Sequence, residues 1–594
     1  TARVVGGVDL VGDAYTGSNA PAPDPDPMDC NGHGTHVAST VGGGGVKSDG
    51  TPFTGPYDTS TPFSSLKLGP GVAPQAKLYA IRVFGCGGST AVTVQGIDWA
   101  LDPNGDNDLS DHLDVINMSL GSNYGSLSNT SSMAADNAAR MGVIVVASAG
   151  NAGDTYTISG APGAGQRVIA TAAVGDAGVP GAFVRVNAPA SIAGDYVAGA
   201  SSMVDASNNP TAASAGQTGD VVLALSGSST LACAALTNAS AVSGKIALVD
   251  RGTCGFGVKY EMARAAGAIA VIVGNNAAGS PIAMGGTVNG PVDIPAAMIT
   301  LDAANALKAR LAASDTVNAT FPATSQGDIL ASFSSRGPRT GLSGVKPDLS
   351  APGISITAAQ TGVTCTGTAP STGCQTANAS GYLAGSQNLV LSGTSMAAPH
   401  AAGMMALLKQ RFPDRSVEEM KAMAMNTSLH DVYQFAGNIN RIGVDRSGAG
   451  RIDPVKALQS TVAAFNADEP GAVNLAFFGE VVGTQTQVKR IRVVNYGTTA
   501  QSFSLAFDVA NDAPGIAFSL PGGSSITVPA GGTAFVDVQV AGTAAQMDHV
   551  RDVSADAAQS VTAPSALAAL GGMPRHYLTN KSGYLNLSQA GNVV

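Results

Sequence analysis

Charged side chains are scarce in this sequence. Asp, Glu, Lys and Arg make up 12% of its 594 residues, against about 25% in an average soluble protein. The 31 basic residues form no cluster that could grip phosphate groups or an anionic membrane, and a net charge of -10 is spread over the whole chain. Hydrophobic residues reach 44%. This balance excludes a disordered chain, a coiled coil and a nucleic-acid-binding protein, so we expect no nucleic acid among the partners.

Long apolar runs are missing as well. The most apolar stretches, residues 143–147 and 268–273, have the length of strands, whereas a membrane-spanning helix needs about 20 residues. We therefore expect no membrane span. The sequence starts at Thr1 with neither a charged and apolar leader nor an initiator Met, and we expect that targeting information was removed or never included.

Cysteine is limited to six residues, none with the spacing of a zinc site. Six cysteines can pair in many ways in principle. Two pairs that are close in the sequence and one distant pair give the predicted disulfides: Cys233–Cys254, Cys365–Cys374 and Cys30–Cys86. Because disulfides persist in oxidising compartments, we expect a secreted or extracytoplasmic protein.

Short apolar runs alternate with helical stretches between residues 78 and 174. Such continuous apolar runs are typical of parallel strands that helices cover on both faces. The pattern predicts an α/β fold with a doubly wound, mostly parallel sheet. The predicted strands are residues 78–84, 115–119, 143–148 and 168–174, and the predicted helices are residues 91–101 and 129–141.

A segment of different composition interrupts this alternation of apolar runs and helical stretches. After about residue 185 the chain becomes rich in Gly, Ala, Ser and Asn, and a strand–helix–strand signal follows at residues 245–275. The alternation of apolar runs and helical stretches returns near residue 330 and ends in two predicted helices. After these helices, hydrophobic residues alternate with period two, which predicts a β-sandwich. We expect the last strand to be cut at the end of the chain. The predicted units are 1–190 with 325–465, an insertion at 191–324, and a sandwich at 466–594, and the two helices are 395–409 and 416–425.

Three segments carry residues suited to nucleophilic catalysis. Ser395 follows Gly393 at the predicted start of an apolar helix, where free N–H groups stabilise developing negative charge. His33 also opens a predicted helix between glycines and could take the proton of a serine. Asn151 lies on a Gly-flanked turn after a buried strand, and its amide could donate to an oxyanion.

Four segments together resemble the signature blocks of the subtilisin-like serine proteases, in the same order: HGTHVA at 33–38, NMSLG at 117–121, AGN at 149–151 and GTSMAAPH at 393–400. The resemblance implies that Ser395 is the nucleophile, His33 the general base and Asn151 an oxyanion donor beside the Ser395 N–H. It also implies that Ser119, Leu120 and Gly121 pair with an extended protein or peptide substrate.

Further blocks resemble those of large subtilases that carry a protease-associated domain between the oxyanion Asn and the nucleophile. They are FSSRGP at 333–338, KPDLSAPG at 346–353 and GAGRID at 448–453. The insertion, with GKIALVDRG at 244–252 and IPAAM at 294–298, looks like that α+β domain. Residues 466–594 resemble a fibronectin type III-like domain.

The family's catalytic Asp is the one element of the triad that the sequence does not show. The family order is Asp, His, Ser, yet residues 1–32 contain no Asp-Thr-Gly or Asp-Ser-Gly motif. Residues 3–7 resemble the strand that follows the catalytic Asp, so we expect this residue upstream of residue 1. Asp9 and Asp13 are the rivals within the chain. Three more acidic residues in a Pro-rich loop are expected to be solvated or to face a metal: Asp24, Asp26 and Asp29.

A second acidic loop follows the predicted helix 91–101. Asp102, Asn104, Asp106 and Asp108 place oxygen ligands at alternate positions, which suits Ca²⁺ as in the first half of an EF-hand loop. The later positions of that motif do not match. We predict a structural calcium site here, with an acidic loop that ends the helix as the alternative, and no cofactor for catalysis.

Two other functions compete with a secreted serine endopeptidase. An α/β-hydrolase esterase is disfavoured because the segment around Ser395 lacks the second Gly of a nucleophile elbow and His33 precedes the serine. A non-catalytic protein-binding or adhesion protein is favoured by the missing Asp and disfavoured by the intact motifs. We expect a monomer, and small residues around 147–153 predict a broad preference for bulky apolar residues at the P1 position of a substrate.

Overall fold

The computed structural model describes most of the chain. The described residues are 3–175, 183–205, 216–277, 281–282, 284–321, 328–341, 344–360, 388–435, 439–477, 480–548, 552, 554–555, 560–561, 573–574, 580–589 and 592–593. Among these residues no helix has both the length and the apolar character that crossing a membrane requires. The predicted bridge between Cys365 and Cys374 lies outside the described residues.

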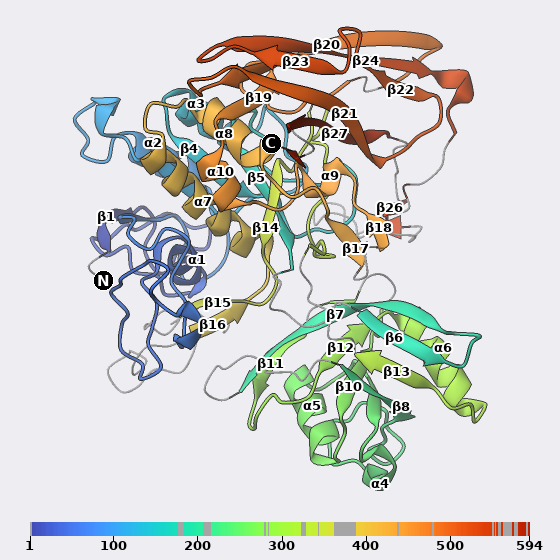
Figure 1. Ribbon diagram of the computed structural model, residues 1–594. Helices are drawn as coiled ribbons and strands as arrows, with labels where there is room; N and C mark the ends of the chain where they lie inside the picture. Colours follow the sequence, from blue (N-terminus) through green and yellow to red (C-terminus); the bar gives the residue numbers. More distant parts are fainter. Residues whose placement is uncertain are drawn as a thin grey trace.

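Four parallel strands form the central sheet, in the order β14-β5-β4-β3. Helices cover both of its faces (Figure 1). Ile144 in β4 packs into a core with α7 and α8, whereas its neighbour Val145 packs into a core with α2 and α3. The predicted doubly wound α/β architecture is therefore confirmed. The bounds are β3 Val115–Met118, β4 Ile144–Ser148, β5 Ile169–Val174, β14 Leu349–Pro352, α2 Thr93–Leu101, α3 Thr130–Arg140, α7 Thr394–Arg411 and α8 Val417–Asn426.

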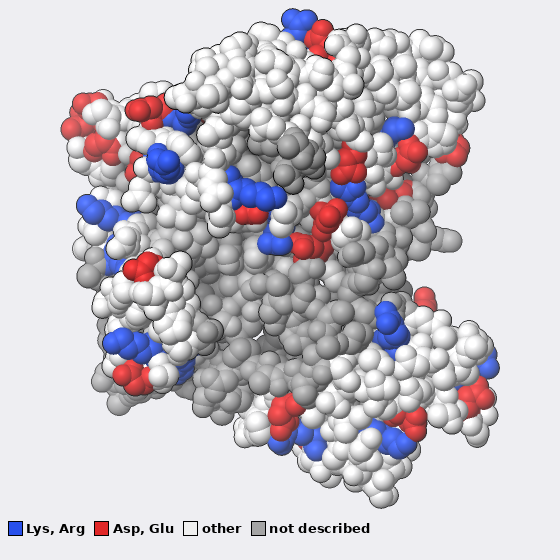
Figure 2. All heavy atoms as spheres, in the orientation of Figure 1, with Lys and Arg blue, Asp and Glu red and all other residues white. Residues whose placement is uncertain are grey.

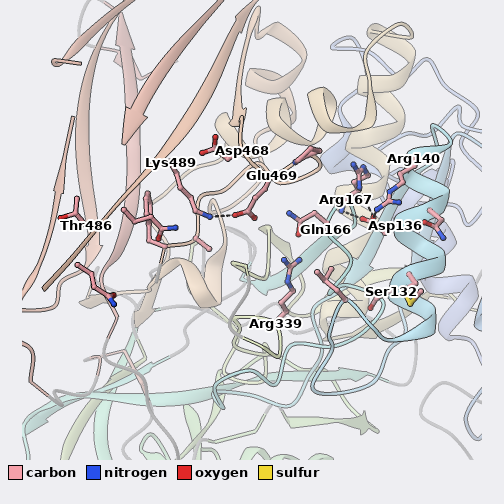
Figure 3. Close-up of a pocket in the computed structure, with 18 residues that line it drawn as sticks. Ser132, Asp136, Arg140, Gln166, Arg167, Arg339, Asp468, Glu469, Thr486 and Lys489 are labelled. Atoms are coloured by element: carbon pink, nitrogen blue, oxygen red, sulfur yellow. Dashed lines mark hydrogen bonds and ion pairs between the residues drawn. The ribbon is translucent and has the colours of Figure 1, made fainter. Parts of the chain in front are cut away.

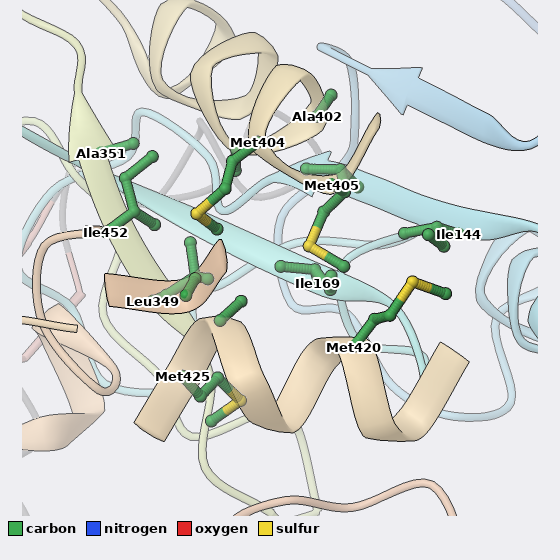
Figure 4. Packing of buried hydrophobic residues seen from close by; sticks show 14 of the residues in the cluster. Ile144, Ile169, Leu349, Ala351, Ala402, Met404, Met405, Met420, Met425 and Ile452 are labelled. Atoms are coloured by element: carbon green, nitrogen blue, oxygen red, sulfur yellow. The ribbon is translucent and has the colours of Figure 1, made fainter. Parts of the chain in front are cut away.

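Methionine and alanine fill the core between the sheet and α7. Met404 and Met405 of α7 lie over Ile169, and Met420 of α8 closes the far side (Figure 4). The side chains of Ile169, Met404, Met405 and Met420 are all fully buried. Flexible methionines adapt to gaps between small alanines, so this helix is held by close apolar packing along its length.

The N-terminal strands form a small sheet of their own. Strand β1 (Val4–Asp9) pairs in parallel with β2 (Leu78–Arg82), and the chain between them contains α1 (His33–Gly42). Helix α1 packs against α7. Gly403 permits this approach, because a Cβ there would lie 2.6 Å from the side chain of Val72 and 3.3 Å from the carbonyl oxygen of Val41.

The insertion is built around one sheet of eight strands, ordered β11-β7-β12-β10-β9-β8-β13-β6. Its first strand along the chain, β6, begins at Phe183, so this unit starts before the predicted boundary at 191. An additional pairing between β6 and β7 closes seven of the eight strands into a ring, with β11 attached outside. The predicted strand–helix–strand is β9, α5 and β10, with β9 and β10 parallel. The bounds are β6 Phe183–Ala188, β7 Gly194–Asp205, β8 Gln217–Leu223, α4 Ala239–Val242, β9 Ile246–Asp250, α5 Phe256–Ala265, β10 Ala270–Gly274, β11 Met284–Val288, β12 Ala296–Ile299, α6 Leu301–Ala312 and β13 Asn318–Phe321.

Two four-stranded sheets pack against each other in the C-terminal region, which we define as residues 462–594. Val493 and Val536 of one sheet meet Phe503 and Leu505 of the other in the core between them. The first strand, β19, begins a few residues before the predicted boundary at 466. The sheets are β19-β20-β24-β22 and β23-β21-β27-β28, with bounds β19 Val462–Asn466, β20 Thr484–Asn495, β21 Gln501–Asn511, β22 Ile516–Ser519, β23 Ser525–Val528, β24 Thr533–Thr543, β27 Ser582–Gln589 and β28 Asn592–Val593.

Short elements complete the described fold. They are the strand pairs β15 Ile356–Ala359 with β16 Asn388–Leu391, β17 Tyr433–Phe435 with β18 Ile439–Arg441, and β25 Ser560–Val561 with β26 Met573–Pro574, and the helices α9 Val444–Ser447 and α10 Pro454–Gln459. The insertion lies apart from the C-terminal sheets, on the opposite side of the central sheet (Figure 1). Figure 2 shows charged side chains of both signs scattered over a mostly uncharged face, as the composition predicts.

Candidate active site

Ser395 lies in the first turn of α7, where the sequence places it. Its hydroxyl donates a hydrogen bond to the carbonyl oxygen of Ser119 (3.3 Å), and the hydroxyl of Ser119 donates to the carbonyl oxygen of Ser395 (2.7 Å). The first N–H groups of a helix have no partners within it, so negative charge that develops beside Ser395 is stabilised there. The structure therefore brings Ser395 and Ser119 together.

Asn151 lies beside the same helix end, on the turn that follows β4. Its side-chain oxygen accepts hydrogen bonds from the N–H (2.9 Å) and the hydroxyl (2.8 Å) of Thr394. These contacts identify the oxygen of the amide and leave its NH₂ group as the donor. Gly150 permits the turn, because its φ is +108° and a Cβ at this position would lie only 2.8 Å from Ser335 Oγ. The amide of Asn151 is thus held at the start of α7, beside Ser395.

His33 is the first residue of α1 and is half-buried. Burial lowers the pKa of His33, and the nearby carboxylate of Asp29 partly opposes this shift. The imidazole is therefore neutral near pH 7, the form that can accept a proton. One turn along α1, Val37 packs against Met396, the neighbour of Ser395. Helix packing in this way places the imidazole-bearing end of α1 next to the start of α7.

Asp29 has a structural role that the sequence analysis missed. Its carboxylate accepts hydrogen bonds from the N–H groups of Asn31 (2.8 Å), Gly32 (2.9 Å) and Thr35 (2.7 Å). The expectation of a solvated or metal-facing side chain is wrong for Asp29, because it caps the helix that carries His33. An acidic residue a few positions before a helix start was the available signal. Asp24 and Asp26 are exposed, as expected.

Asp9 and Asp13, the rivals for the catalytic Asp, both bind Arg82. Asp9 is buried and lies 3.3 Å from the guanidinium, and it also accepts from the N–H groups of Val11 (2.7 Å) and Gly12 (2.8 Å). Asp13 lies 2.7 Å from the same guanidinium. These contacts tie the ends of β1 and β2 together, so both carboxylates serve the fold of this small sheet.

Ser119, Leu120 and Gly121 follow β3 directly. Ser122 and Ala161 exchange backbone hydrogen bonds of 3.0 and 3.1 Å. A Cβ on Gly121 would lie 2.5 Å from the carbonyl oxygen of Ala161, so only glycine permits this approach. The hydroxyl of Ser148 donates to the carbonyl oxygen of Leu120 at 3.3 Å. The segment is thereby fixed beside Ser395 at one edge of the sheet.

The acidic loop after α2 is folded around one carboxylate. Asp102 accepts hydrogen bonds from the N–H groups of Gly105 (2.8 Å), Asp106 (3.1 Å) and Asn107 (2.9 Å). The carboxylates of Asp102, Asp106 and Asp111 come within 4.8 Å of one another. Of the other two predicted ligands, Asn104 donates to the Asp106 carboxylate (3.0 Å), and Asp108 accepts from the N–H of Ser110 (3.0 Å). Three carboxylates suit a divalent cation.

A cavity of about 1420 Å³ lies away from Ser395, between α3 and the C-terminal region. Arg339 and Gln166 face Glu469 and Lys489 across it (Figure 3). Its charged groups are largely paired, as in the contacts of Arg167 with Asp136 (3.1 Å). None of the predicted site residues lines this cavity, so it is not the candidate active site.

The parallel sheet, with Ser395 at a helix start and the Asn151 amide beside it, defines a subtilisin-like α/β fold with additional C-terminal β-sheets. The chain belongs to the subtilase family, whose model, described as "Subtilase family", matches residues 11–456. The two predicted disulfides within the described residues, Cys30–Cys86 and Cys233–Cys254, are confirmed.

Relatives with curated names are proteases. The minor extracellular protease Vpr of Bacillus subtilis (strain 168) is 30% identical over 529 residues, which cover 88% of this chain and 56% of the relative. The subtilisin-like protease SBT1.3 of Arabidopsis thaliana is 29% identical over 459 residues, covering 73% of this chain and 52% of the relative. The chain thus spans about half the length of these relatives.

Solved structures are also similar to this chain, among them the crystal structure of the psychrophilic subtilisin-like protease Apa1 from the Antarctic psychrotroph Pseudoalteromonas sp. AS-11. It is 20% identical, and the match covers 76% of this chain and 88% of that chain. The TM-score is 0.32, too low to support a conclusion about fold or function.

Proposed function

We propose that this protein is a secreted serine endopeptidase that hydrolyses peptide bonds of proteins. The observation that carries the proposal is the contact of Thr394 with Asn151, because it directs the amide donor towards the helix end that presents Ser395. Family membership and the protease names of the relatives support the same reaction. The disulfides, and a relative named as extracellular, support secretion.

In the proposed mechanism, the hydroxyl oxygen of Ser395 attacks the scissile carbonyl carbon while His33 takes the hydroxyl proton. To do so, Ser395 gives up its hydrogen bond to Ser119. The tetrahedral oxyanion accepts hydrogen bonds from the Asn151 amide and the Ser395 N–H. His33 then gives its proton to the leaving amine, and water hydrolyses the acyl-enzyme by the same steps.

We further propose that the catalytic Asp comes from a segment N-terminal to Thr1. Strand β2 pairs with β1, and β3 pairs with β4; within the described residues the other edge of each strand has no partner. One further parallel strand between β2 and β3 would join the two sheets. Asp9 and Asp13 both form ion pairs with Arg82, and these contacts do not support either of them as the catalytic Asp.

The domain identities belong to the same proposal. The closed sheet with its β9–α5–β10 unit supports a protease-associated domain at residues 191–324, inserted into a catalytic domain of residues 1–190 and 325–465. The paired C-terminal sheets support a fibronectin type III-like domain at residues 466–594. A monomer acting on protein or peptide substrates completes the proposal.

We also propose a broad preference for bulky apolar P1 residues. Ser119, Leu120 and Gly121 would pair with the substrate backbone, and the buried, small Ala147 and Ala149 would leave room for its side chain. A peptide-library cleavage profile measures this preference. Cleavage after apolar residues is expected, and a profile led by Arg or Asp at P1 would refute it.

Labelling by a fluorophosphonate probe tests the proposed chemistry. The probe is applied to this chain and to a form extended at the N-terminus, each beside a Ser395→Ala control. We expect labelling of the extended form, absent from its control, and much slower labelling of the chain that starts at Thr1. If neither form reacts although circular dichroism shows both folded, the non-catalytic binding protein replaces the peptidase.

A further inference from the structure

The turn that carries Asn151 is fastened to one neighbouring segment, residues 333–336, which we call the backing segment. Four hydrogen bonds join the two on both sides of Asn151. They run from Gly153 N–H to Phe333 O (2.8 Å), from Ser335 N–H to Gly150 O (3.0 Å), from Arg336 N–H to Gly153 O (3.2 Å) and from Ala152 N–H to Ser335 Oγ (3.0 Å). The position of the backing segment therefore sets the position of the Asn151 amide.

Arg336 anchors the backing segment by its side chain, which is 0% exposed. Its guanidinium binds the carboxylates of Asp154, Asp445 (2.7 Å) and Asp552 (3.3 Å), and it lies 4.7 Å from the centre of the Tyr156 ring. A buried charge is stable only when it is paired and hydrogen-bonded. The three carboxylates thus hold Arg336, and with it the backing segment, in one place.

Asp552 is the carboxylate that the C-terminal region contributes. It lies 216 positions after Arg336 in the chain and is 6% exposed. A tight turn holds it, because Ser554 donates to it from its N–H (2.8 Å) and from its hydroxyl (2.9 Å). The Ser554 hydroxyl also lies 3.5 Å from the Arg336 guanidinium. A buried part of the C-terminal region therefore reaches the support of the oxyanion turn.

We propose that Asp552 is a positioning residue for catalysis, which acts through Arg336 and the backing segment on the amide of Asn151. The inference rests on the proposed function of Asn151. Without the Asp552 carboxylate, Arg336 settles towards Asp154 and Asp445, and the backing segment moves with it. Because an oxyanion donor contacts charge that exists only in the transition state, this movement lowers kcat and leaves KM nearly unchanged.

The kinetic test compares Asp552→Ala with Asp508→Ala in the form of the protein that the serine probe labels. Asp508 also forms an ion pair at the domain boundary, but its partner is Arg441 (2.7 and 2.8 Å) and not a residue of the backing segment. We expect kcat to fall roughly tenfold in Asp552→Ala, since small displacements at an active site are costly, and KM to stay within about twofold. Unchanged kcat in a folded Asp552→Ala variant would overturn the proposal.

A double-mutant cycle separates positioning from general destabilisation. In an Asn151→Ala background the amide is gone, so Asp552→Ala should cost no further activity. Fully additive losses would mean that Asp552 acts elsewhere, and would overturn the proposal. If Asp552→Ala does not fold, Asp552→Asn keeps the size of the side chain and removes its charge, and the same cycle is run with it.

Hydrogen exchange gives a readout that needs no activity. Amides in residues 149–155 should exchange faster in the Asp552 variant and at the wild-type rate in Asp508→Ala. Faster exchange in a protein that the serine probe does not label would uphold the positioning and reject the proposed chemistry. Unchanged exchange would reject the positioning, whatever the activity of the wild-type protein.

Discussion

Helices α1 and α7 present His33 and Ser395, and they are held in place in opposite ways. Helix α7 is buried along most of its length in a core of alanine and methionine, under the central sheet. Helix α1 depends on polar contacts near its start: the Asp29 cap, the Cys30–Cys86 disulfide and the Arg82 ion pairs. We call α7 with Ser395 the nucleophile side and α1 with His33 the base side. The nucleophile side should therefore unfold only together with the whole domain, whereas the base side can unfold locally.

The largest effect is expected on the nucleophile side. Met404→Ala removes a fully buried side chain from the core beneath α7, and such changes cost about 2–5 kcal/mol. Met133→Ala on α3 is the matched control, because its side chain is 51% exposed. It should change the free energy of unfolding by less than about 0.5 kcal/mol. Denaturant titration measures both, and equal effects would contradict the buried-core account of α7.

Loss of the Cys30–Cys86 disulfide should act on the base side alone. Cys86 also holds Asn31, which lies two residues before His33 and whose side-chain amide donates to the Cys86 carbonyl oxygen at 3.2 Å. Replacing both cysteines with alanine should cost about 2–4 kcal/mol of local stability. Amide exchange should then accelerate in α1 and not in α7. The control, Cys233→Ala with Cys254→Ala, should leave α1 unchanged; acceleration in both helices would refute a separate base side.

Acid should weaken the base side through His36, which lies inside α1 and donates to the carbonyl oxygen of Ile356 (2.9 Å). Burial lowers the pKa of His36 from 6.5 to about 4. The unfolded chain therefore binds more protons between these values, and the stabilisation, roughly 3 kcal/mol at most, is complete above pH 6.5 and lost as pH falls towards 4.

Denaturant midpoints between pH 7 and pH 4 measure this loss. His430, whose pKa burial also lowers to about 4, titrates in the same window and contributes with the same sign. His33, whose pKa burial also lowers, contributes with the same sign. His36→Gln should accordingly reduce the pH dependence and leave the share of His33 and His430. An unchanged profile in His36→Gln would show that His36 is protonated in the folded protein or stays neutral in both states.

A smaller effect is expected from the helix cap. Asp29→Ala should destabilise α1 by about 1 kcal/mol, since three N–H groups lose their acceptor. Asp29→Asn keeps a capping oxygen and removes the charge that raises the pKa of His33. In Asp29→Asn we therefore expect the acid limb of the pH–activity profile to move to lower pH with little loss of stability. A shift to higher pH would contradict the assigned charge effect.

The smallest effect concerns the acidic loop that follows α2. The sequence predicts a calcium site at Asp102, Asn104, Asp106 and Asp108, and the structure brings Asp102 and Asp106 together with Asp111. If this loop holds Ca²⁺, chelation should lower the melting temperature by roughly 2–4 °C for about 1 kcal/mol of linkage. Asp111→Asn should abolish that response. A wild-type melting temperature that EDTA does not change would retire the calcium site and leave Asp102 as a turn residue.

The sequence predicts the nucleophile side better than the base side, for a physical reason. Apolar periodicity is a local signal, and it marks the strands around Ile144 and the start of α7 at Ser395 within a residue or two. The Asp29 cap depends on a carboxylate that reaches six residues ahead to Thr35. The one local signal for it is an acidic residue a few positions before a helix start, and Asp24 and Asp26 in the same Pro-rich loop offer acidic side chains that remain exposed.

Contacts between distant segments are harder still to predict. The closing pair of β6 and β7, and the pairing of β13 with both β6 and β8, depend on register across the whole insertion. The bond from Arg336 to Asp552 joins residues that lie 216 positions apart. In the sequence these two residues are one Arg and one Asp in unrelated contexts. The orientation of Asn151 was also hidden, because Thr394 fixes it from the other end of the domain.

The closed ring of the insertion has a consequence for contacts between copies of this chain. An extended chain adds to a sheet most readily where a strand offers its backbone groups at an open edge. In the described ring from β6 to β13, each strand is paired on both sides, and the open edge belongs to β11 (Met284–Val288). Within the described residues, a second copy of the chain would therefore find an open strand edge in this ring only at β11.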